Sequence, residues 1–192
     1  MNAVSTRIPG ALIVEPVVYG DDRGFFLESF NEVEMRRLGI DAHFVQDNHS
    51  RSQRNVLRGL HYQIQQPQGK LVRAVLGKVY DVAVDLRRDS PAFGKWLGVE
   101  LSEDNKRMLW LPPGLAHGFV VLSDCADFVY KTTDYYAQKS ERSLLWNDPD
   151  LGIDWPLEGQ PILSAKDAAG KLFRDAEVFE TDPMRKGSNA EQ

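Results

Sequence analysis

The run Val79-Tyr80-Asp81-Val82-Ala83-Val84-Asp85-Leu86 is the clearest strand pattern in the chain. Side chains alternate along a strand, so Tyr80, Val82, Val84 and Leu86 share one face. Asp81 and Asp85 fall on the other face. We therefore expect a strand with one packed face and one face turned toward water or a cavity.

Similar short alternating segments follow one another from Asp41 to Trp146. No helical pattern separates them, so parallel βαβ units are not expected and an antiparallel sandwich or barrel is favoured. Gly77-Lys78 predicts a tight hairpin turn before Val79. The expected strands are Phe44–Asn48, Val56–Gln63, Lys70–Leu76, Val79–Leu86, Trp96–Leu101, Arg107–Leu111, His117–Leu122, Phe128–Thr132 and Ser143–Trp146.

Helical patterns are confined to the two ends of this series. Asn31 predicts a helix cap with Glu34 as its capping-box partner, followed by a short helix over Glu32–Leu38. Gly39 is placed to end that helix. Helical character returns only at Ser164–Leu172. The expected fold class is therefore all-β with a few short helices at its N- and C-terminal ends.

The N-terminal region carries two apolar segments between Leu12 and Phe30, on either side of a turn-like stretch at Tyr19–Gly24. Pro16 predicts an edge strand or a bend. Met1 to Gly10 lacks the apolar core of a signal peptide, and no apolar run in the sequence reaches membrane-spanning length. We expect a cytoplasmic protein that does not bind membranes.

Length and composition narrow the class further. A chain of 192 residues is expected to form one domain, here residues 1–180, followed by a disordered tail at 181–192. The 23 basic and 28 acidic residues are interspersed, which argues against nucleic acid or an anionic membrane as partner. Cys125 is the single cysteine, so neither a disulfide nor a thiolate metal site is expected.

Four side chains suited to chemistry come from separate expected strands and would converge in a closed barrel: His61, Lys70, His117 and Tyr130. The histidine at 117 ends the run Pro112-Pro113-Gly114-Leu115-Ala116-His117. This P-x-G-x-x-H spacing resembles the second motif of the cupin barrels, in which the histidine points into the barrel. The resemblance implies an antiparallel jelly-roll barrel.

The first cupin motif would supply H-x-H and a later glutamate as metal ligands, whereas this sequence has His61-Tyr62-Gln63. A catalytic metal site needs about three protein ligands, and glutamine is a poor replacement for imidazole. We therefore expect no metal and no cofactor, which leaves the histidines for acid–base work. A metal-dependent cupin oxygenase or isomerase is the alternative that this departure disfavours.

Taken together, the motifs resemble a narrower family, the dTDP-4-dehydrorhamnose 3,5-epimerases, over about Gly10 to Phe179. The segments that carry the resemblance, in order, are Asp22–Glu28, Gln46–Asn48, Arg58–Gln63, Gln68–Lys70, Asn105–Arg107, Pro112–Phe119, Tyr130-Lys131, Tyr135-Tyr136, Leu145–Asp148 and Leu163–Asp167.

The resemblance implies an isomerase acting on dTDP-4-dehydro-6-deoxy-D-glucose. Both epimerised carbons of this sugar, C3 and C5, are α to the C4 ketone, so removal of either proton gives an enolate. His61 is the expected base, and Asp167 is expected to hydrogen-bond its imidazole. Tyr130 matches the proton donor on the opposite face, and Lys70 would stabilise the enolate oxygen.

By the same resemblance a set of residues contacts the nucleotide-sugar or lines its pocket, with Phe26 and Tyr136 as packing aromatics and cationic groups facing the diphosphate. Part of the family's pocket comes from an N-terminal segment of the neighbouring subunit, which implies a homodimer. The expected binding residues are Arg23, Phe26, Glu28, Gln46, Asp47, Asn48, Arg58, His117, Tyr136, Glu141 and Lys166.

Several alternatives stay open from the residues alone. Asp167 also fits the first turn of a helix capped by Ser164. Arg58 and His61 point to opposite faces of a regular strand, so Gly59 must mark a bulge or Arg58 must reach the site from the rim. An epimerase acting at C3 or C5 only, and a non-catalytic sugar-binding cupin, are the alternative functions.

Overall fold

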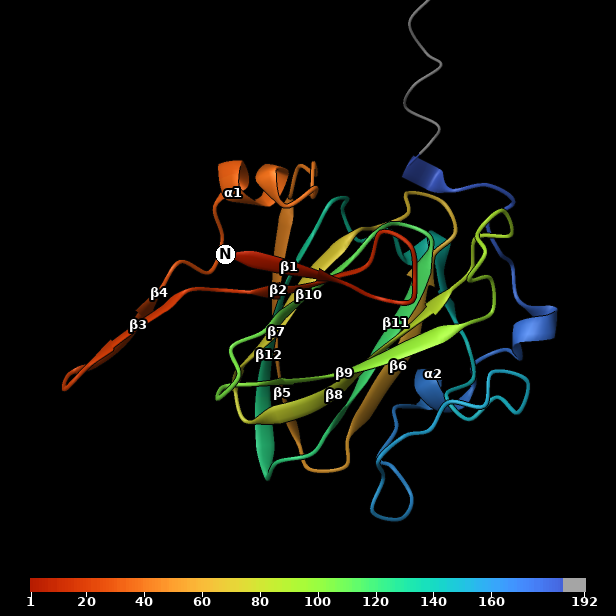
Figure 1. Cartoon of the computed structure of the whole chain (residues 1–192). Helices are drawn as coiled ribbons and strands as arrows, with labels where there is room; N and C mark the ends of the chain where they lie inside the picture. The colour runs from red at the N-terminus through yellow and green to blue at the C-terminus, as the bar shows by residue number, and fades with distance from the viewer. Residues whose placement is uncertain (185–192) are drawn as a thin grey trace, which may run out of the picture.

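The computed structural model describes residues 1–184, which fold into a barrel of β-strands (Figure 1). The strands are β1 (Asn2–Ser5), β2 (Leu12–Glu15), β3 (Val18–Asp21), β4 (Gly24–Leu27), β5 (Gln46–Gln53), β6 (Leu57–Gln63), β7 (Lys70–Leu76), β8 (Lys78–Asp85), β9 (Trp96–Ser102), β10 (Met108–Leu111), β11 (Leu115–Val121), β12 (Cys125–Thr132) and β13 (Glu141–Ser143).

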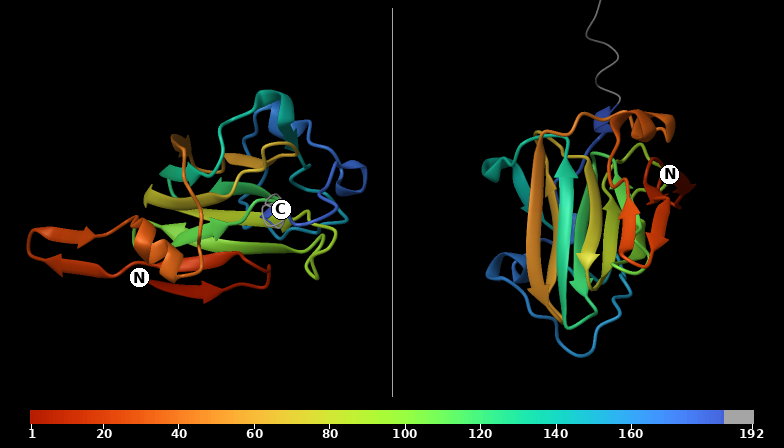
Figure 2. Two further views of the ribbon diagram at one scale, coloured as in Figure 1. Left: turned by 90° about the horizontal axis from the view of Figure 1, so that it is seen from above. Right: turned by 90° about the vertical axis from the view of Figure 1, so that its left-hand side faces the viewer.

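Two antiparallel sheets face each other in this part of the chain. One sheet has the strand order β1-β2-β10-β7-β12-β5, and the other has the order β13-β6-β11-β8-β9. A separate hairpin, β3–β4, projects away from the barrel in both Figure 1 and the left view of Figure 2. The predicted all-β jelly-roll class is confirmed, although β1 was not predicted and the turn of the hairpin is shorter than Tyr19–Gly24.

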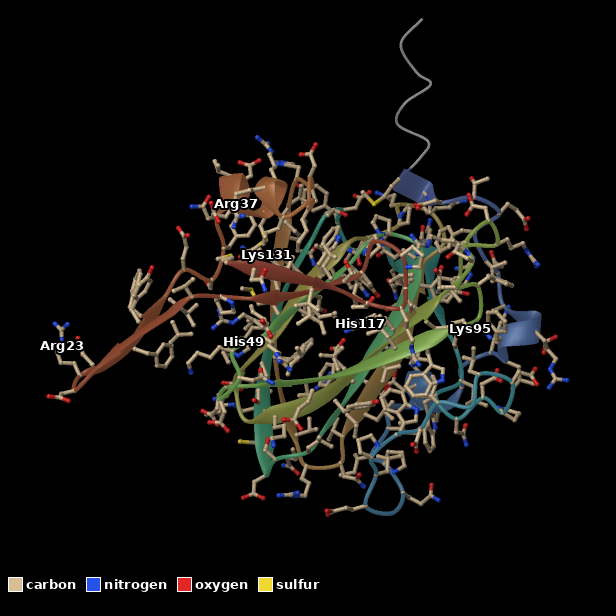
Figure 3. All side chains as sticks on the ribbon, in the orientation of Figure 1. Arg23, Arg37, His49, Lys95, His117 and Lys131 are labelled. Atoms are coloured by element: carbon tan, nitrogen blue, oxygen red, sulfur yellow. The ribbon has the colours of Figure 1, made fainter. Side chains whose placement is uncertain are left out.

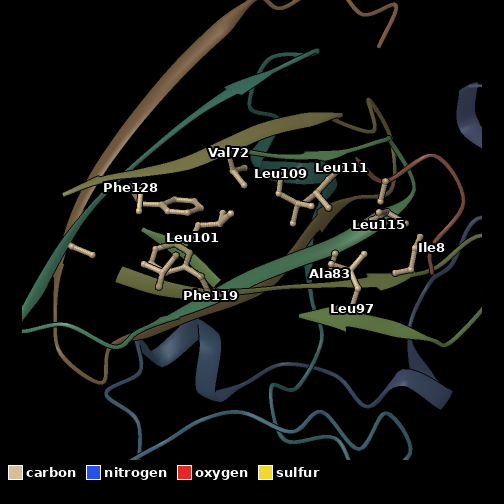
Figure 4. Packing of buried hydrophobic residues seen from close by; sticks show 14 of the residues in the cluster. Ile8, Val72, Ala83, Leu97, Leu101, Leu109, Leu111, Leu115, Phe119 and Phe128 are labelled. Atoms are coloured by element: carbon tan, nitrogen blue, oxygen red, sulfur yellow. The ribbon is translucent and has the colours of Figure 1, made fainter. Parts of the chain in front are cut away.

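The main core fills the space between the two sheets (Figure 4). Phe128 of β12 and Phe119 of β11 stack there with ring centroids 4.2 Å apart, so one aromatic ring from each sheet meets the other. A second core lies under the C-terminal segment and a third under the helix α1 (Glu32–Arg37). Both sheets are therefore covered on parts of their outer faces as well.

Both faces of β8 are covered, although one of them was expected to meet water or a cavity. Val82 and Val84 pack under the C-terminal segment, while Ala83 lies in the core between the sheets. Asp81 and Asp85 are fully buried. The face that carries them meets the barrel interior rather than water.

The predicted hairpin at Gly77-Lys78 is wrong, because β7 and β8 belong to different sheets. Gly77 instead forms a corner between the sheets, with φ +68°. A Cβ atom at this position would lie 2.1 Å from the carbonyl oxygen of Cys125. A sharp corner and a two-residue hairpin use the same residue types, so the sequence does not separate them.

The two predicted helices are present at the expected places. Asn31 Oδ1 accepts from the backbone N–H groups of Val33 and Glu34, which confirms the cap of α1. The Glu34 carboxylate accepts from Arg37 at 2.9 Å, a bond not foreseen by the capping box. The second helix, α2, spans only Ala165–Ala168. Its expected continuation is absent, because the backbone of Lys171 instead pairs with Ser143 and Leu145.

The C-terminal segment also contains two 3₁₀ turns, Gln138–Ser140 and Phe173–Asp175. Within the tail expected from Thr181, Asp182 pairs with the buried Arg87 at 3.2 Å. The remainder of that tail, residues 185–192, lies outside the described residues. None of the helices in the described part of the chain is long and apolar enough to cross a membrane.

Candidate active site

A cavity of about 370 Å³ opens between the two sheets. All four expected catalytic side chains line it: His61, Lys70, Tyr130 and Asp167. The expected binding residues that also line it are Gln46, Asn48, Arg58, His117, Tyr136, Glu141 and Lys166.

Four expected binding residues lie outside this cavity. Asp47 alternates with Gln46 and Asn48 on β5, so its side chain is on the outer face, where Lys131 Nζ donates to it at 2.9 Å. The Asp47 side chain therefore does not line this chain's own cavity, and its expected contact with the nucleotide-sugar stays a prediction. Arg23 and Phe26 belong to the projecting hairpin, whose tip carries the label of Arg23 in Figure 3. Glu28 follows the hairpin and accepts from Asn31 at 2.9 Å.

The imidazole of His61 bonds to Asp167, with Nε2 and Oδ1 2.5 Å apart. Asp167 also accepts from Ser164 Oγ at 2.6 Å and from the Gly59 N–H at 3.3 Å. Burial alone would raise the pKa of the Asp167 carboxyl, but the bonds from His61 and Ser164 outweigh it and lower that pKa to about 2. A charged carboxylate only accepts, so Nε2 carries a proton and Nδ1 keeps the lone pair of a base.

Asp167 holds this contact from the first turn of α2, which Ser164 caps through the backbone N–H of Asp167. The helix-cap interpretation and the contact with His61 are therefore both correct. The short helix fixes the carboxylate behind the imidazole before any ligand is present.

Arg58 and His61 reach the same cavity because β6 carries a bulge. His117 of β11 lies opposite His61 and Phe119 lies opposite Arg58, so β6 has one residue more than its partner over this interval. Gly59 provides the extra residue with φ +131°, and a Cβ atom there would lie 2.5 Å from the Gly118 Cα. Of the two alternatives that the sequence left open, the bulge at Gly59 is the one that the structure has.

Lys70 enters from β7 in the other sheet and is buried. Its ammonium donates to the backbone carbonyl of His61 at 3.4 Å. Burial lowers the pKa of Lys70 to about 8, while the carboxylates of Asp81 and Glu141 act in the opposite direction. The side chain thus remains a cation at neutral pH.

Asp81 was not predicted as a site residue. Its carboxylate meets His117 Nε2 at 2.9 and 3.1 Å beneath the cavity. Burial lowers the pKa of His117 and raises that of Asp81. The sequence showed only that Asp81 alternates with apolar residues along a strand, which does not tell an inward-facing carboxylate from an outward-facing one.

Tyr130 faces the cavity from β12, and so from the sheet opposite to that of His61. Burial raises the pKa of its phenol, which is therefore protonated at neutral pH. A base on one wall and a protonated acid on the other can reach opposite faces of a ligand held between them.

The rim of the cavity is tied together by Glu141. Lys166 Nζ donates to one of its carboxylate oxygens at 2.7 Å, and Tyr136 Oη donates to the other at 3.0 Å. These bonds outweigh the effect of burial and lower the pKa of Glu141.

The model of the family described as dTDP-4-dehydrorhamnose 3,5-epimerase matches residues 5–175. The chain belongs to this family. A dTDP-4-dehydrorhamnose 3,5-epimerase of Pseudomonas aeruginosa is 61% identical over 180 residues, which are 93% of this chain and 99% of that protein.

Solved structures of the epimerase family have the same fold. An epimerase from Legionella pneumophila, in complex with dTDP-4-keto-L-rhamnose, is 58% identical with a TM-score of 0.89, over 92% of this chain and 94% of that one. A 3′-monoepimerase from Streptomyces bikiniensis, in complex with dTDP-quinovose, is 36% identical with a TM-score of 0.83, over 91% and 88%.

The two histidines of this epimerase-family cavity bond to two different carboxylates, Asp167 and Asp81. Within residues 1–184, no group of three or more His, Cys, Asp or Glu side chains is arranged to hold a metal ion. The geometry therefore offers two separate His–Asp pairs around a single cavity, which the ammonium of Lys70 and the phenol of Tyr130 also line.

Proposed function

We propose that this protein is a dTDP-4-dehydro-6-deoxy-D-glucose 3,5-epimerase, which gives dTDP-4-dehydro-L-rhamnose in dTDP-L-rhamnose biosynthesis. The observation that carries the proposal is the His61–Asp167 pair in a cavity whose opposite wall presents Tyr130. The 61% identity to the Pseudomonas aeruginosa epimerase, over nearly the whole of both chains, supports the same reaction.

In the proposed reaction, His61 Nδ1 takes the proton from C3 or C5 of the sugar. The C–H electron pair moves into the ring as an enolate, and its charge resides on O4. Lys70, a buried cation, stabilises that oxygen where a preorganised charge is most effective. Asp167 stabilises the imidazolium that forms, and Tyr130 returns a proton to the opposite face, which restores the ketone with inverted configuration.

The nucleotide part of the ligand is a dianionic diphosphate, and the chain carries a net charge of −5. Local cations must therefore attract it. Arg58 and Lys166 line the cavity and supply these charges, since guanidinium and ammonium groups are suited to phosphate oxygens.

Proton exchange tests the function directly. The purified protein in deuterated buffer is expected to place deuterium at both C3 and C5 of the keto-sugar, as followed by NMR. His61→Ala is expected to place none. Exchange at one carbon only would favour a monoepimerase, for which the 36% identity to the Streptomyces bikiniensis protein gives weaker support. Exchange that survives the substitution would contradict the role of His61.

We also propose a homodimer in which the β3–β4 hairpin of one copy reaches the cavity of the other. Phe25 and Phe26 of the hairpin are 59% and 70% exposed, and Tyr19 is 64% exposed. Aromatic side chains exposed together on a projecting arm favour a partner surface. Arg23 and Phe26 lie outside this chain's own cavity, so a second copy is the place where they would act. A cytoplasmic location is proposed as well, with which the free Cys125 is compatible.

A further inference from the structure

Residues 134–137, here called the rim segment, lead from β12 to the turn at Gln138–Ser140 and place Tyr136 at the cavity. Three glutamine side chains bond to the backbone of this segment. Gln68 Nε2 donates to the Asp134 carbonyl at 2.8 Å, and Gln46 Oε1 accepts from the Tyr136 N–H at 3.1 Å. Gln63 makes the other two glutamine hydrogen bonds to the backbone of this segment.

Gln63 bonds to the rim segment at two points. Its Oε1 accepts from the Ala137 N–H at 2.8 Å, and its Nε2 donates to the Tyr135 carbonyl at 3.3 Å. The same Nε2 donates to the Gln66 carbonyl at 2.7 Å. Gln63 is only 4% exposed, so these backbone groups have a buried partner that water cannot easily replace.

The two bonds of Gln63 to the rim segment flank Tyr136 in the sequence. The tyrosine ring itself is 55% exposed, and its hydroxyl donates to Glu141. A half-exposed ring on an irregular segment has many orientations unless its backbone is fixed. A fixed backbone removes part of the entropy that a ligand would otherwise lose on binding.

We propose that Gln63 is a positioning residue, whose amide fixes the rim segment so that Tyr136 is held in place for the nucleotide-sugar before it binds. Gln46 and Gln68 are secondary ties in the same arrangement. The inference rests on the proposed function, because it takes a nucleotide-sugar as the ligand of this cavity. It gives a role to the residue that stands where the cupin H-x-H pattern has its second histidine.

Gln63→Met tests this role, because methionine has similar length but neither donates nor accepts as an amide does. The Kd for dTDP, measured by isothermal titration calorimetry, is expected to rise about tenfold, since backbone groups are left unpaired and the segment must be ordered on binding. The kcat for the keto-sugar is expected to change less than about twofold because His61 and Tyr130 keep their places. Gln53→Met, at the exposed end of β5, is the matched control and is expected to leave both values unchanged.

A double-mutant cycle separates positioning from a general structural effect. In a Tyr136→Ala background, Gln63→Met is expected to add little to the loss of dTDP affinity, because the side chain that Gln63 positions is already absent. The inference would be overturned if the fold-increase in Kd of the double variant equalled the product of the two single-variant increases. A loss of kcat on Gln63→Met in the Tyr136→Ala background would overturn it as well.

Two further measurements complete the test. Gln63→Glu is the second variant, for use if Gln63→Met is not folded at the temperature of the titration. It keeps the acceptor for the Ala137 N–H and loses the donor, so an intermediate Kd is expected. An unchanged Kd in a folded Gln63→Met protein contradicts the positioning role of Gln63 but leaves the proposed function standing. Wild-type protein that binds dTDP without exchanging the sugar protons contradicts the proposed function alone, and wild-type protein that binds no dTDP contradicts both.

Discussion

At the scale of single residues, Asp167 accepts from three groups: the imidazole of His61, the hydroxyl of Ser164 and the N–H of Gly59. These bonds hold the carboxylate in its charged form and fix the protonated nitrogen of the ring. The proposed base therefore has its orientation and its tautomer set by the fold, at no cost during the reaction.

Asp167→Asn is expected to lower kcat about 10³-fold, because an amide cannot stabilise the imidazolium as a carboxylate does, and can donate to Nε2, which moves the ring proton to Nδ1. Steady-state kinetics measures the change. Ser164→Ala is the control, since it removes the helix cap and one of the three bonds to the carboxylate but keeps the carboxylate itself. It is expected to lower stability by about 1 kcal/mol with a much smaller effect on kcat. Equal kcat losses in the two variants would assign the effect to the helix rather than to the charge.

Lys70 predicts a pH dependence. The proposed role needs the protonated amine, and its pKa in the ligand-free protein is about 8, so kcat/KM is expected to fall along a limb centred near that pH as the pH rises. Asp81→Asn removes a nearby negative charge that favours the cation, and should therefore move this limb to lower pH. Lys70→Met should show a low kcat/KM that does not fall in this way as the pH rises. A fall at the same pH in Lys70→Met would show that another titrating group causes it.

Much of the cavity lining could be predicted from the sequence, since His61, Lys70, His117 and Tyr130 do converge. Asp81 could not be assigned a partner. A buried carboxylate in an apolar strand has the sequence pattern of an outward-facing one, and only the register of β8 against β11 brings it to His117.

At the scale of elements, the positions of β5 to β13 were predicted to within a few residues, and their partners were not. Alternation is local information, whereas pairing depends on segments far apart in the sequence. The corner at Gly77 shows the difference, because the strands before and after it were correctly located and wrongly paired. The end of α2 is a similar case, since the backbone of Lys171 pairs with Ser143 and Leu145 from a distant part of the chain.

Gly59→Ala is expected to separate β6 from β11, because the new Cβ would lie 2.5 Å from the Gly118 Cα. Overpacking of this kind costs about 1–3 kcal/mol. We expect a lower Tm. We also expect the protein that remains folded to lose activity, since the positions of Arg58 and His61 both depend on the bulge. Gly24→Ala is the control for backbone strain in Tm, because Gly24 has φ +130° with no atom near its Cβ position. Equal changes in Tm would show that strain alone, without the close approach, explains the effect.

At the scale of the whole molecule, the barrel and the hairpin are separate in shape (Figure 2). The barrel carries the proposed chemistry, while the hairpin carries Arg23 and exposed aromatic side chains. The family resemblance assigned both to one binding site, and the position of the hairpin away from this chain's cavity favours the proposed site shared between two copies.

Mixing subunits tests this arrangement. His61→Ala and Phe26→Ala are each expected to have low activity alone. After dissociation and random reassociation, about a quarter of the sites should combine an intact barrel with an intact hairpin from the other copy. Activity should therefore return to about a quarter of the wild-type value. Sedimentation measures the oligomeric state in the same samples, and no recovery in mixed dimers would place Phe26 outside the shared site.

The stacked rings of Phe119 and Phe128 set how far apart the two sheets stand. The proposed proton acceptor belongs to one sheet and the proposed donor to the other, so the thickness of the apolar layer is also the span that a sugar ring must bridge. Aromatic packing in the interior thereby acts as a spacer for the reaction. A smaller side chain at Phe119 or Phe128 is therefore expected to change how efficiently the proton is returned to the opposite face, although no ionisable group is altered.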